Sequence, residues 1–433
     1  MHRGLRAPRG LPGDPHLERL AERAHAAHKH RAGLRPPASL DHLREGGAGR
    51  AAPGGAPREM RVQTLPVLTL RGSPREQGRQ HGEALRGEVA HNLEVYLRRF
   101  LTDGRLTPGE VERRAAAYLE VFTRESPRYR EEMEGIAEGS GRTLLEIAML
   151  NGRYEILYSA YSAIGMAEAA GGCTAFAASR AVTADGHLWI GQTWDWIPGV
   201  RGVLVDLEED GLRILAFTEA GIAGGKIGMN AAGIGLVVNG LLSNLDDWAR
   251  LGVPFHLRTA GILRSRTLAE AVARATEGVH ACSANFLIAR GGGTGSNGAE
   301  DVVDLETSPA GWVVHTPTDG MLAHANHFLQ PERLAIWQPL REERSSTYLR
   351  CERMAQLLAE RTAAGPLTVS DLEALLRDHH GRPDSICRHP NPRLPQEERS
   401  ETVFAVLMDL DALEMRYAAG APCAVPFRTL SLV

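Results

Sequence analysis

A change of hydrophobic periodicity near Gly171 constrains the fold of this chain more than any other feature of its sequence. Upstream of it, from Pro74 to about Ala170, apolar residues recur at helical spacing. Downstream of it, short runs of alternating and β-branched residues are separated by turn signals such as ADG and EDG, and helical patterns return only in places. Helices first and strands afterwards predict a layered α+β fold rather than a series of alternating β–α units.

The helical part contains clear start signals. Ser73 before Pro74, and Thr107 before Pro108, each place an N-cap residue ahead of a proline at the first helical position. A third stretch, RTLLEIAMLNGRYEILYSAY, is apolar enough to form a buried helix. Three later helices and a C-terminal strand hairpin are also predicted, the helices at 266–278, 346–362 and 368–379 and the hairpin at 401–420.

Residues 1–59 differ in composition from the rest of the chain. They carry eleven basic and six acidic side chains, a net charge of +5, and include a Gly-, Pro- and Ala-rich run typical of a linker. We therefore predict a disordered N-terminal extension, with Met60 as a candidate native start. Its histidines, His25, His28 and His30, could meet at a metal ion, but a solvated basic helix is the favoured interpretation.

The bulk composition argues against several classes of function. A formal net charge of −4 and 5% aromatic residues give no basis for nucleic-acid binding. Five widely spaced cysteines without a C-x-x-C pair argue against a disulfide framework and against a structural zinc site. No apolar run approaches the length of about 18 residues typical of a membrane span, and the N-terminus lacks the apolar core of a secretory signal. A soluble cytoplasmic protein is expected.

The segment AAGGCTAF places Cys173 directly after two glycines, at the start of an expected strand. With ADG as a three-residue loop and Gly186 in the left-handed conformation, this strand would pair with the one that ends at Asp195. That register sets Cys173 opposite Ile197 and Ala175 opposite Asp195, so the thiol and the carboxylate would share one face. A two-residue loop would place them on opposite faces.

A thiol in this setting suits a nucleophile that later becomes the N-terminus of a shortened chain. The glycines leave the carbonyl of Gly172 open to attack by the Cys173 thiol, and hydrolysis of the thioester would free an α-amino group. That amine, with an ordinary pKa of about 7.7–8.0, could accept the proton of a thiol whose ordinary pKa is about 8.5. On this stretch alone, a buried structural cysteine is an equal alternative.

A resemblance to a known family rests on several blocks spread over the chain. These are LLEIAMLNGRYE, GGCTAF, GQTWDW, TEAGIAGGKIGMNAAGIGLVVNGL, LETSPAG, HANHF and SICRH. From about Leu70 onward they resemble the acyl-coenzyme A:isopenicillin N (6-aminopenicillanic acid) acyltransferase family, whose members are self-processing N-terminal-nucleophile cysteine enzymes. The resemblance implies a four-layer αββα sandwich and autocleavage between Gly172 and Cys173. The products would be a mostly helical α chain over 60–172 and a β chain over 173–433, which remain associated.

The resemblance also implies roles for individual residues. Cys173 occupies the nucleophile position, Asp195 that of the carboxylate that orients the new amine, and Asn326 that of the oxyanion donor. Arg388 matches an arginine near the nucleophile, where a fixed cation would favour the thiolate. The separation between Cys173 and Asp195 exceeds the family pattern, which predicts a longer or bulged hairpin. Candidate substrate contacts are Thr174, Lys226 and Ser308.

The expected activity is cleavage or formation of the amide bond of a small acylated amine or peptide, through an acyl-thioester on Cys173. No cofactor and no metal site are expected, while acyl-coenzyme A is a candidate acyl donor and further oligomerisation is left open. His324 and His327, which flank Asn326, are expected to pack or hydrogen-bond rather than bind metal. The alternative is an unprocessed, catalytically silent binding or scaffold protein of the same fold. A serine hydrolase is unsupported because no G-x-S-x-G motif occurs.

Overall fold

The computed structural model describes residues 65–164, 172–293, 299–338, 345–395 and 399–432. The predicted extension over 1–59, with its histidines and Met60, lies outside these residues. The helices before the nucleophile segment are α2 (Pro74–Ala84), α3 (Arg86–Thr102), α4 (Pro108–Glu125), α5 (Pro127–Ser140), α6 (Leu144–Asn151) and α7 (Arg153–Ile164). The later helices are α8 (Phe255–Leu263), α9 (Leu268–Thr276), α10 (Ser345–Ala364) and α11 (Val369–Leu376). None of the helices in this described part is both long and apolar enough to span a membrane.

The strands form two sheets. One has the order β1-β4-β5-β6-β7-β8-β9-β10, with β1 (Val67–Leu70), β4 (Gly202–Glu209), β5 (Leu212–Glu219), β6 (Ile227–Asn230), β7 (Ile234–Gly240), β8 (Ala284–Arg290), β9 (Val302–Ser308) and β10 (Gly311–His315). The other has the order β11-β2-β3-β12-β13-β14, with β2 (Thr174–Ala178), β3 (Trp189–Trp196), β11 (Met321–His324), β12 (Glu401–Asp409), β13 (Glu414–Ala418) and β14 (Arg428–Ser431). Among these pairings only β1 with β4 is parallel.

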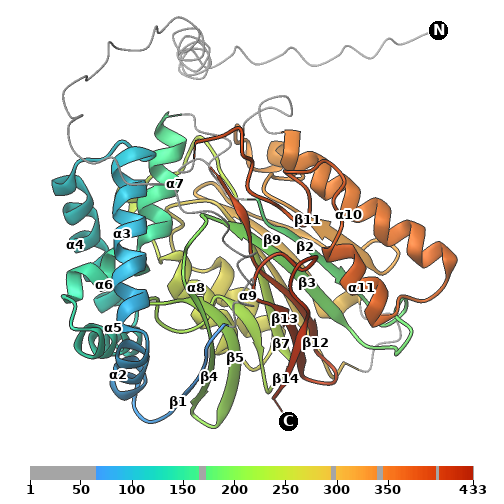
Figure 1. Cartoon of the computed structure of the whole chain (residues 1–433), viewed down its shortest axis with the longest axis horizontal. Helices are drawn as coiled ribbons and strands as arrows, with labels where there is room; N and C mark the ends of the chain where they lie inside the picture. The colour runs from blue at the N-terminus through green and yellow to red at the C-terminus, as the bar shows by residue number, and fades with distance from the viewer. Residues whose placement is uncertain (1–64, 165–171, 294–298, 339–344, 396–398, 433) are drawn as a thin grey trace, which may run out of the picture. The chain divides into compact units, whose positions relative to one another are not determined.

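The two sheets are stacked between two layers of helices. Strands β2 and β3 contact β7 across the space between the sheets, α8 and α9 pack on β6 to β9, and α10 and α11 pack on β2, β3, β11 and β12. Figure 1 shows α10 and α11 (orange) on one side of the strands and α2 to α7 (blue to green) on the other side of the view. Every residue of β3 and β7 is buried, as expected for strands covered on both faces. The four-layer αββα sandwich is thus confirmed.

Local start signals were predicted correctly, whereas two helix breaks were not. Ser73 caps α2 and Thr107 caps α4, each with a proline at the first turn. The stretch after Pro74 forms two helices that meet at Leu85, and the third predicted helix divides at Gly152 into α6 and α7. The later helices and the hairpin of β12 and β13 are confirmed, while α8 and β14 were not predicted.

Helices α2 and α5 cross in direct backbone contact through glycines on both sides. A Cβ added to Gly78 would lie 2.0 Å from the carbonyl oxygen of Glu132, and one added to Gly135 would lie 2.0 Å from that of Arg75. No larger residue fits at these positions without separating the helices. The crossing therefore depends on glycine for space rather than for backbone freedom.

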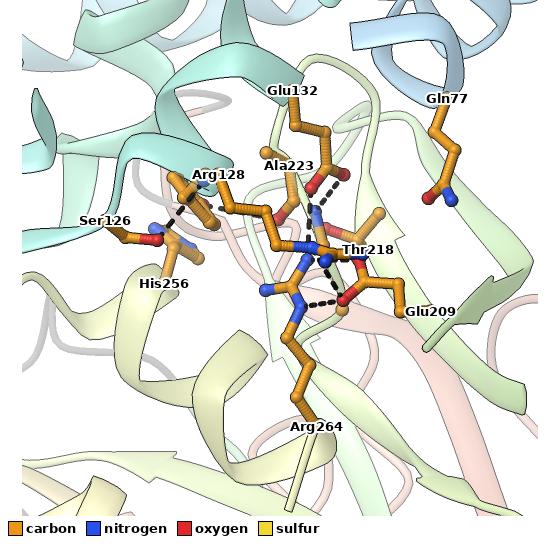
Figure 2. Close-up of polar contacts among 12 residues, drawn as sticks. Gln77, Ser126, Arg128, Glu132, Glu209, Thr218, Ala223, His256 and Arg264 are labelled. Atoms are coloured by element: carbon orange, nitrogen blue, oxygen red, sulfur yellow. Dashed lines mark hydrogen bonds and ion pairs between the residues drawn. The ribbon is translucent and has the colours of Figure 1, made fainter. Parts of the chain in front are cut away.

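A buried ion network joins α5 to β4 of the eight-stranded sheet. Arg264, which ends α8, contacts Glu132 of α5 at 3.1 Å and Glu209 of β4 at 2.5 Å. Glu132 also accepts the backbone N–H of Gly224 at 2.6 Å, and Arg128 lies 3.2 Å from Glu209. Figure 2 shows the Arg264 guanidinium between the two carboxylates. One cation thus joins segments from before and after the nucleophile in the sequence.

Candidate active site

Cys173 lies immediately before β2, with its side chain buried between the two sheets. Its thiol is 3.9 Å from the backbone carbonyl oxygen of Asp195, to which it can donate. Its own carbonyl oxygen accepts hydrogen bonds from Asn239 Nδ2 at 3.1 Å and from Arg350 Nη1 at 2.6 Å. The bond from Asn239 therefore links the two sheets, because Asn239 belongs to β7 of one sheet and Cys173 leads into β2 of the other.

The predicted register of the strand pair is wrong. Ala175 lies opposite Gln192, not Asp195, so this register puts Cys173 and Ala175 on the opposite face of the sheet from Asp195, and the predicted shared face is wrong. Strand β2 ends at Ala178 and β3 begins at Trp189, which confirms a longer connection than the three-residue loop. Gly186 does have the expected left-handed backbone, with φ of 71°.

Tertiary contacts explain the longer connection between β2 and β3. Arg180 forms ion pairs with Asp301 at 2.6 Å and with Asp411 at 2.8 Å. The backbone N–H of Ala184 donates to the carbonyl oxygen of Leu367 at 2.8 Å. These long-range partners draw the segment out of a tight hairpin, and none of them could be read from the local turn signal.

Asp195 is fully buried, and its two carboxylate oxygens differ. Oδ1 accepts a hydrogen bond from the Thr402 hydroxyl at 2.6 Å. Oδ2 lies 3.6 Å from Arg388 Nε and has no hydrogen-bond partner among the described residues. Burial raises the pKa of Asp195 to about 7, against the opposing effect of Arg388 and Arg350. One oxygen of this carboxylate can thus accept a further hydrogen bond.

Arg388 connects Asp195 with the backbone before the nucleophile. A Cβ on Gly172 would lie 2.5 Å from Arg388 Nε, so the guanidinium reaches this backbone only because residue 172 has no side chain. Arg388 Nη1 donates to Asp384 at 2.8 Å and Nη2 donates to the Ser346 hydroxyl at 3.1 Å. Its Nε has no hydrogen-bond acceptor in the described part of the chain. A cation with an unused N–H therefore faces the peptide that precedes Cys173.

Arg350 of α10 forms hydrogen bonds with Cys173, Thr174 and Asn326. Its Nη1 contacts the carbonyl oxygen of Cys173 and, at 2.8 Å, the Thr174 hydroxyl, while Nη2 donates to Asn326 Oδ1 at 3.0 Å. Asn326 Nδ2 in turn donates to the carbonyl oxygen of Gly240 at 3.0 Å. An amide nitrogen carries two N–H groups, so this bond uses only one of them. Thr174 and Asn326 thus belong to the surroundings of Cys173.

Lys226 lies in a separate buried cluster between the sheets. Its ammonium is 2.7 Å from Glu219 Oε1 and 3.3 Å from the centre of the Trp194 ring. Arg153 and the Tyr96 hydroxyl also bond to Glu219. Burial lowers the pKa of Lys226 to about 7, with Arg153 adding to the effect and Glu219 opposing it. The charge of Lys226 lowers the pKa of the Cys173 thiol, although burial dominates and raises that pKa to about 11.

Ser308 is placed apart from these groups. It ends β9, where its hydroxyl accepts the backbone N–H of Ala310 at 3.1 Å and contacts the carbonyl oxygen of Gly311 at 3.4 Å. These hydrogen bonds stay inside the turn after β9, and among the described residues no hydrogen bond joins Ser308 to Cys173. The interpretation of His324 is confirmed, because it bonds to Glu306 at 3.0 Å and to the carbonyl oxygen of Ala325 at 2.8 Å. His327 bonds to the Thr347 hydroxyl at 3.1 Å.

Sequence reasoning did not identify Arg350, Thr402 or Asn239. Arg350 is one of 49 basic residues, nearly all of them arginine, so its residue type carries no signal. Thr402 is 207 residues from the carboxylate that it contacts. Asn239 stands within VVNGL, inside one of the blocks already noted, and that block was the only clue available.

The arrangement can support nucleophilic chemistry at sulfur. In this continuous chain the thiol is protonated at neutral pH, since its pKa is raised, and it needs a base in order to react. Asp195 and Arg388 together offer one carboxylate oxygen and one N–H without partners in the described structure. These two atoms lie 3.6 Å apart as an ion pair, so a newly formed amine would have to approach Oδ2 from another side to find its acceptor there.

Comparison of the sequence with known proteins gives two strong matches. A family model described as acyl-coenzyme A:6-aminopenicillanic acid acyl-transferase matches residues 181–424, a range that contains Asp195, Asn326 and Arg388. The 40 kDa form of acyl-coenzyme A:6-aminopenicillanic-acid-acyltransferase from Emericella nidulans is 31% identical over 362 residues. That alignment covers 82% of this chain and 92% of the Emericella protein.

Solved structures give more distant likenesses. The Caenorhabditis elegans ortholog of N-acylethanolamine-hydrolyzing acid amidase is 16% identical, with a TM-score of 0.40, over 55% of this chain and 93% of that one. A mutant of the conjugated bile acid hydrolase from Clostridium perfringens is 11% identical, with a TM-score of 0.39, over 60% of this chain and 92% of its own.

Proposed function

This chain belongs to the acyl-coenzyme A:6-aminopenicillanic acid acyl-transferase family, and from that membership we propose that it is a self-processing amidohydrolase or acyltransferase with Cys173 as its nucleophile. The substrate class is a small acylated amine or peptide, and the bond that reacts is its amide C–N bond. The acyl group is carried as a thioester on the sulfur of Cys173.

The observation that carries the proposal is the placement of Cys173 at the start of β2. Its carbonyl is held by Asn239 and Arg350, its thiol is 3.9 Å from the backbone carbonyl oxygen of Asp195, and the guanidinium of Arg388 lies against Gly172. A structural cysteine would need none of these polar neighbours. Cys282, which is also buried, has its thiol 3.8 Å from the carbonyl oxygen of Glu155, so the polar contacts to the Cys173 backbone, rather than the thiol contact, carry the argument.

Processing is the first step of the proposed mechanism. The thiol of Cys173 adds to the carbonyl of Gly172, and the C–N bond between the two residues breaks as the thiol proton passes to the departing nitrogen. Water then hydrolyses the thioester and leaves a Gly172 carboxylate, a free thiol and a free α-amine. The protonated amine would donate to Asp195 Oδ2, the oxygen without a hydrogen-bond partner among the described residues, and the neutral amine would accept the proton of the thiol.

Turnover uses the same sulfur with the new amine as its base. The amine takes the thiol proton, the thiolate attacks the substrate carbonyl, and the protonated amine returns the proton to the leaving nitrogen. A second N–H of Asn326, beyond the one given to Gly240, would donate to the oxyanion. Removal of one such donor typically costs about 2.7–4 kcal/mol in the barrier. Water or an acceptor amine then takes the acyl group.

The two chains made by cleavage would stay together. Helices α2 to α7 and strand β1 all precede Gly172, yet β1 pairs with β4 and Glu132 of α5 pairs with Arg264. The buried core is also continuous across the cleavage position, since Tyr96 and Trp194 belong to one cluster. Separation would expose this shared core to water.

The name of the Emericella relative supports acyl-coenzyme A as a candidate acyl donor and an amine as the acceptor. Hydrolysis and transfer differ only in what attacks the thioester. Purified protein is therefore to be assayed with a panel of acyl amides, with and without an acceptor amine. Acyl transfer predicts a new amide product in proportion to added amine, whereas hydrolysis predicts free acid at a rate that the amine leaves unchanged.

Mass spectrometry of the denatured protein tests the core of the proposal. Wild type is expected to give two fragments that join at Gly172 and Cys173, and Cys173→Ala is expected to give one uncut chain without activity. Cys282→Ala is the matched control, because it removes an equally buried thiol and is expected to process normally.

A wild-type protein that stays whole would favour the alternative, an unprocessed scaffold of the same fold. So would a Cys173→Ala variant that still turns over substrate. The surroundings of Cys173 argue against that alternative. Asp195 Oδ2 and Arg388 Nε are buried without a hydrogen-bond partner among the described residues, and such groups lower the stability of a protein that does not use them.

A further inference from the structure

Four side chains that could bind a metal ion converge beside the segment that follows α11. They are His379, Cys387, His389 and Cys423, and one ligand atom from each lies within 4.8 Å of all the others. Three come from the segment that follows α11, and Cys423 comes from the segment between β13 and β14. The fold therefore gathers two thiols and two imidazoles from distant parts of the chain.

The measured separations match those of ligands around one tetrahedral ion. His379 Nε2 and His389 Nε2 are 3.0 Å apart, and His389 Nε2 is 3.4 Å from Cys423 Sγ and 3.7 Å from Cys387 Sγ. Bonds of about 2.3 Å to sulfur and about 2.0 Å to nitrogen place tetrahedral ligand atoms about 3.3–3.8 Å apart. The cluster needs little movement to accept an ion at its centre.

The residue types select among ions. Two thiolates with two imidazoles form the Cys₂His₂ set that zinc takes in structural sites. Binding would release one proton from each thiol and leave a neutral site of two thiolates and a divalent cation. A second group, Asp185, His187 and Asp409, is less suited, because His187 already pairs with Asp409 at 2.8 Å and Asp409 accepts two backbone N–H groups.

The cysteine spacing gave no hint of this site. Cys387 and His389 are close in sequence, but no C-x-x-C pair marks the cluster and Cys423 is distant from the other three. The expectation that the chain has no structural zinc site rested on that spacing. Only the packing of the two segments against each other brings the four groups together.

The position of the cluster suggests what the ion would do. Arg388 stands between Cys387 and His389, and its side chain reaches Asp195 and the backbone of Gly172. We propose that His379, Cys387, His389 and Cys423 form a Cys₂His₂ zinc site that ties the segment after α11, which carries Arg388, to the segment after β13. The ion would touch no substrate, so its role is structural.

Metal content tests the site directly. Full-length protein is stripped with a chelator, incubated with zinc alone, desalted and measured by elemental analysis. We expect about one zinc per chain in wild type and less than a tenth of that in Cys423→Ser and His379→Asn. His380→Asn is the matched control, since His380 is the exposed neighbour of His379 and lies outside the cluster, and it is expected to bind zinc like wild type.

Cobalt gives an independent signature. Cobalt-loaded wild type is expected to show thiolate-to-metal charge-transfer absorption, which Cys423→Ser should weaken and His380→Asn should leave unchanged. Equal zinc content in all variants, or a disulfide between Cys387 and Cys423 in protein purified without reductant, would overturn the proposal.

The structural link between the two segments is tested separately. Zinc loading is expected to raise the melting temperature of the Cys173→Ala protein and to leave that of Cys173→Ala/Cys423→Ser unchanged. This measurement uses an uncut and inactive chain, so its outcome does not depend on the proposed function. An unchanged melting temperature in a protein that does bind zinc would overturn the structural link.

Discussion

Two buried carboxylates, one on each sheet, lie in opposite electrostatic settings. Glu219 on β5 meets Arg153, Lys226 and the Tyr96 hydroxyl, and although burial acts to raise its pKa, these cations hold that pKa below its usual value. Asp195 on β3 has one hydrogen bond, from Thr402, and burial raises its pKa to about 7. The Glu219 carboxylate is bonded to α3, α7 and Lys226, whereas the Asp195 carboxylate keeps one oxygen without a hydrogen-bond partner among the described residues.

The largest expected effect comes from Asp195→Asn. Asparagine keeps the size of the side chain but removes the charge that would orient the new amine, so turnover should fall by about 10²–10⁴-fold. The rate of conversion from one chain to two, followed by denaturing gel, and the rate on the best acyl amide are the measurements. A variant that retains wild-type rates would show that this carboxylate is not used.

Glu219→Gln should act on stability instead. It leaves Arg153 and Lys226 buried beside a neutral amide, and loss of one partner from a buried ion pair costs about 3–5 kcal/mol. Urea unfolding of Glu219→Gln and of Asp195→Asn, each in the uncut Cys173→Ala background, measures the change in the free energy of unfolding. If Glu219→Gln and Asp195→Asn destabilise the chain equally, the contrast between the two sites is wrong.

The pH dependence of stability should have opposite signs at the two sites. Asp195 titrates near 7 when folded and near about 3.9 when unfolded, so its contribution is present at low pH and is lost as pH rises through this window, by roughly 1.4 kcal/mol per unit at most. Glu219 has a lowered pKa, so its contribution is present above about 4.3 and is lost as pH falls.

Urea midpoints between pH 4 and 8, in the Cys173→Ala background, measure both contributions. Adding Asp195→Asn should remove the decline toward neutral pH. Adding Glu219→Gln should remove part of the decline toward acid. A difference between Cys173→Ala and Cys173→Ala/Asp195→Asn that grows in the other direction with pH would contradict the assignment.

The smallest effect is expected at the surface. Arg79 and Glu83 form an ion pair of 2.7 Å on α2, but about half of each side chain is exposed. Arg79→Gln should change the free energy of unfolding by less than about 0.5 kcal/mol, because solvent screens such pairs. This variant sets the baseline against which the buried carboxylates are compared.

Features with a local cause were predictable from the sequence. The caps at Ser73 and Thr107 depend on residues within one helical turn, and the structure has both. The layered α+β fold was predicted from the order of helical and strand patterns along the chain. The breaks at Leu85 and Gly152 were missed, because helices continue on both sides of each break and a periodic pattern does not mark the change of direction.

The surroundings of Cys173 were predictable only in part. Asp195, Asn326 and Arg388 were identified from blocks that resemble a family, and the structure places them near Cys173 or its neighbours. The geometric argument for Asp195 was wrong, since Arg180 draws the connection toward Asp301 and Asp411. Arg350 and Thr402 reach the site from distant segments, and nothing in their own sequence neighbourhood marks them.

Strand β1 has a practical consequence for handling the protein. It covers the outer edge of β4, in the only parallel pairing of the described strands, and it lies on the N-terminal side of Gly172. A preparation that loses this segment, through a contaminating protease for example, would bare a row of unsatisfied amide groups along β4. Such material is expected to polymerise edge to edge on storage, so light scattering would register the damage before any assay did.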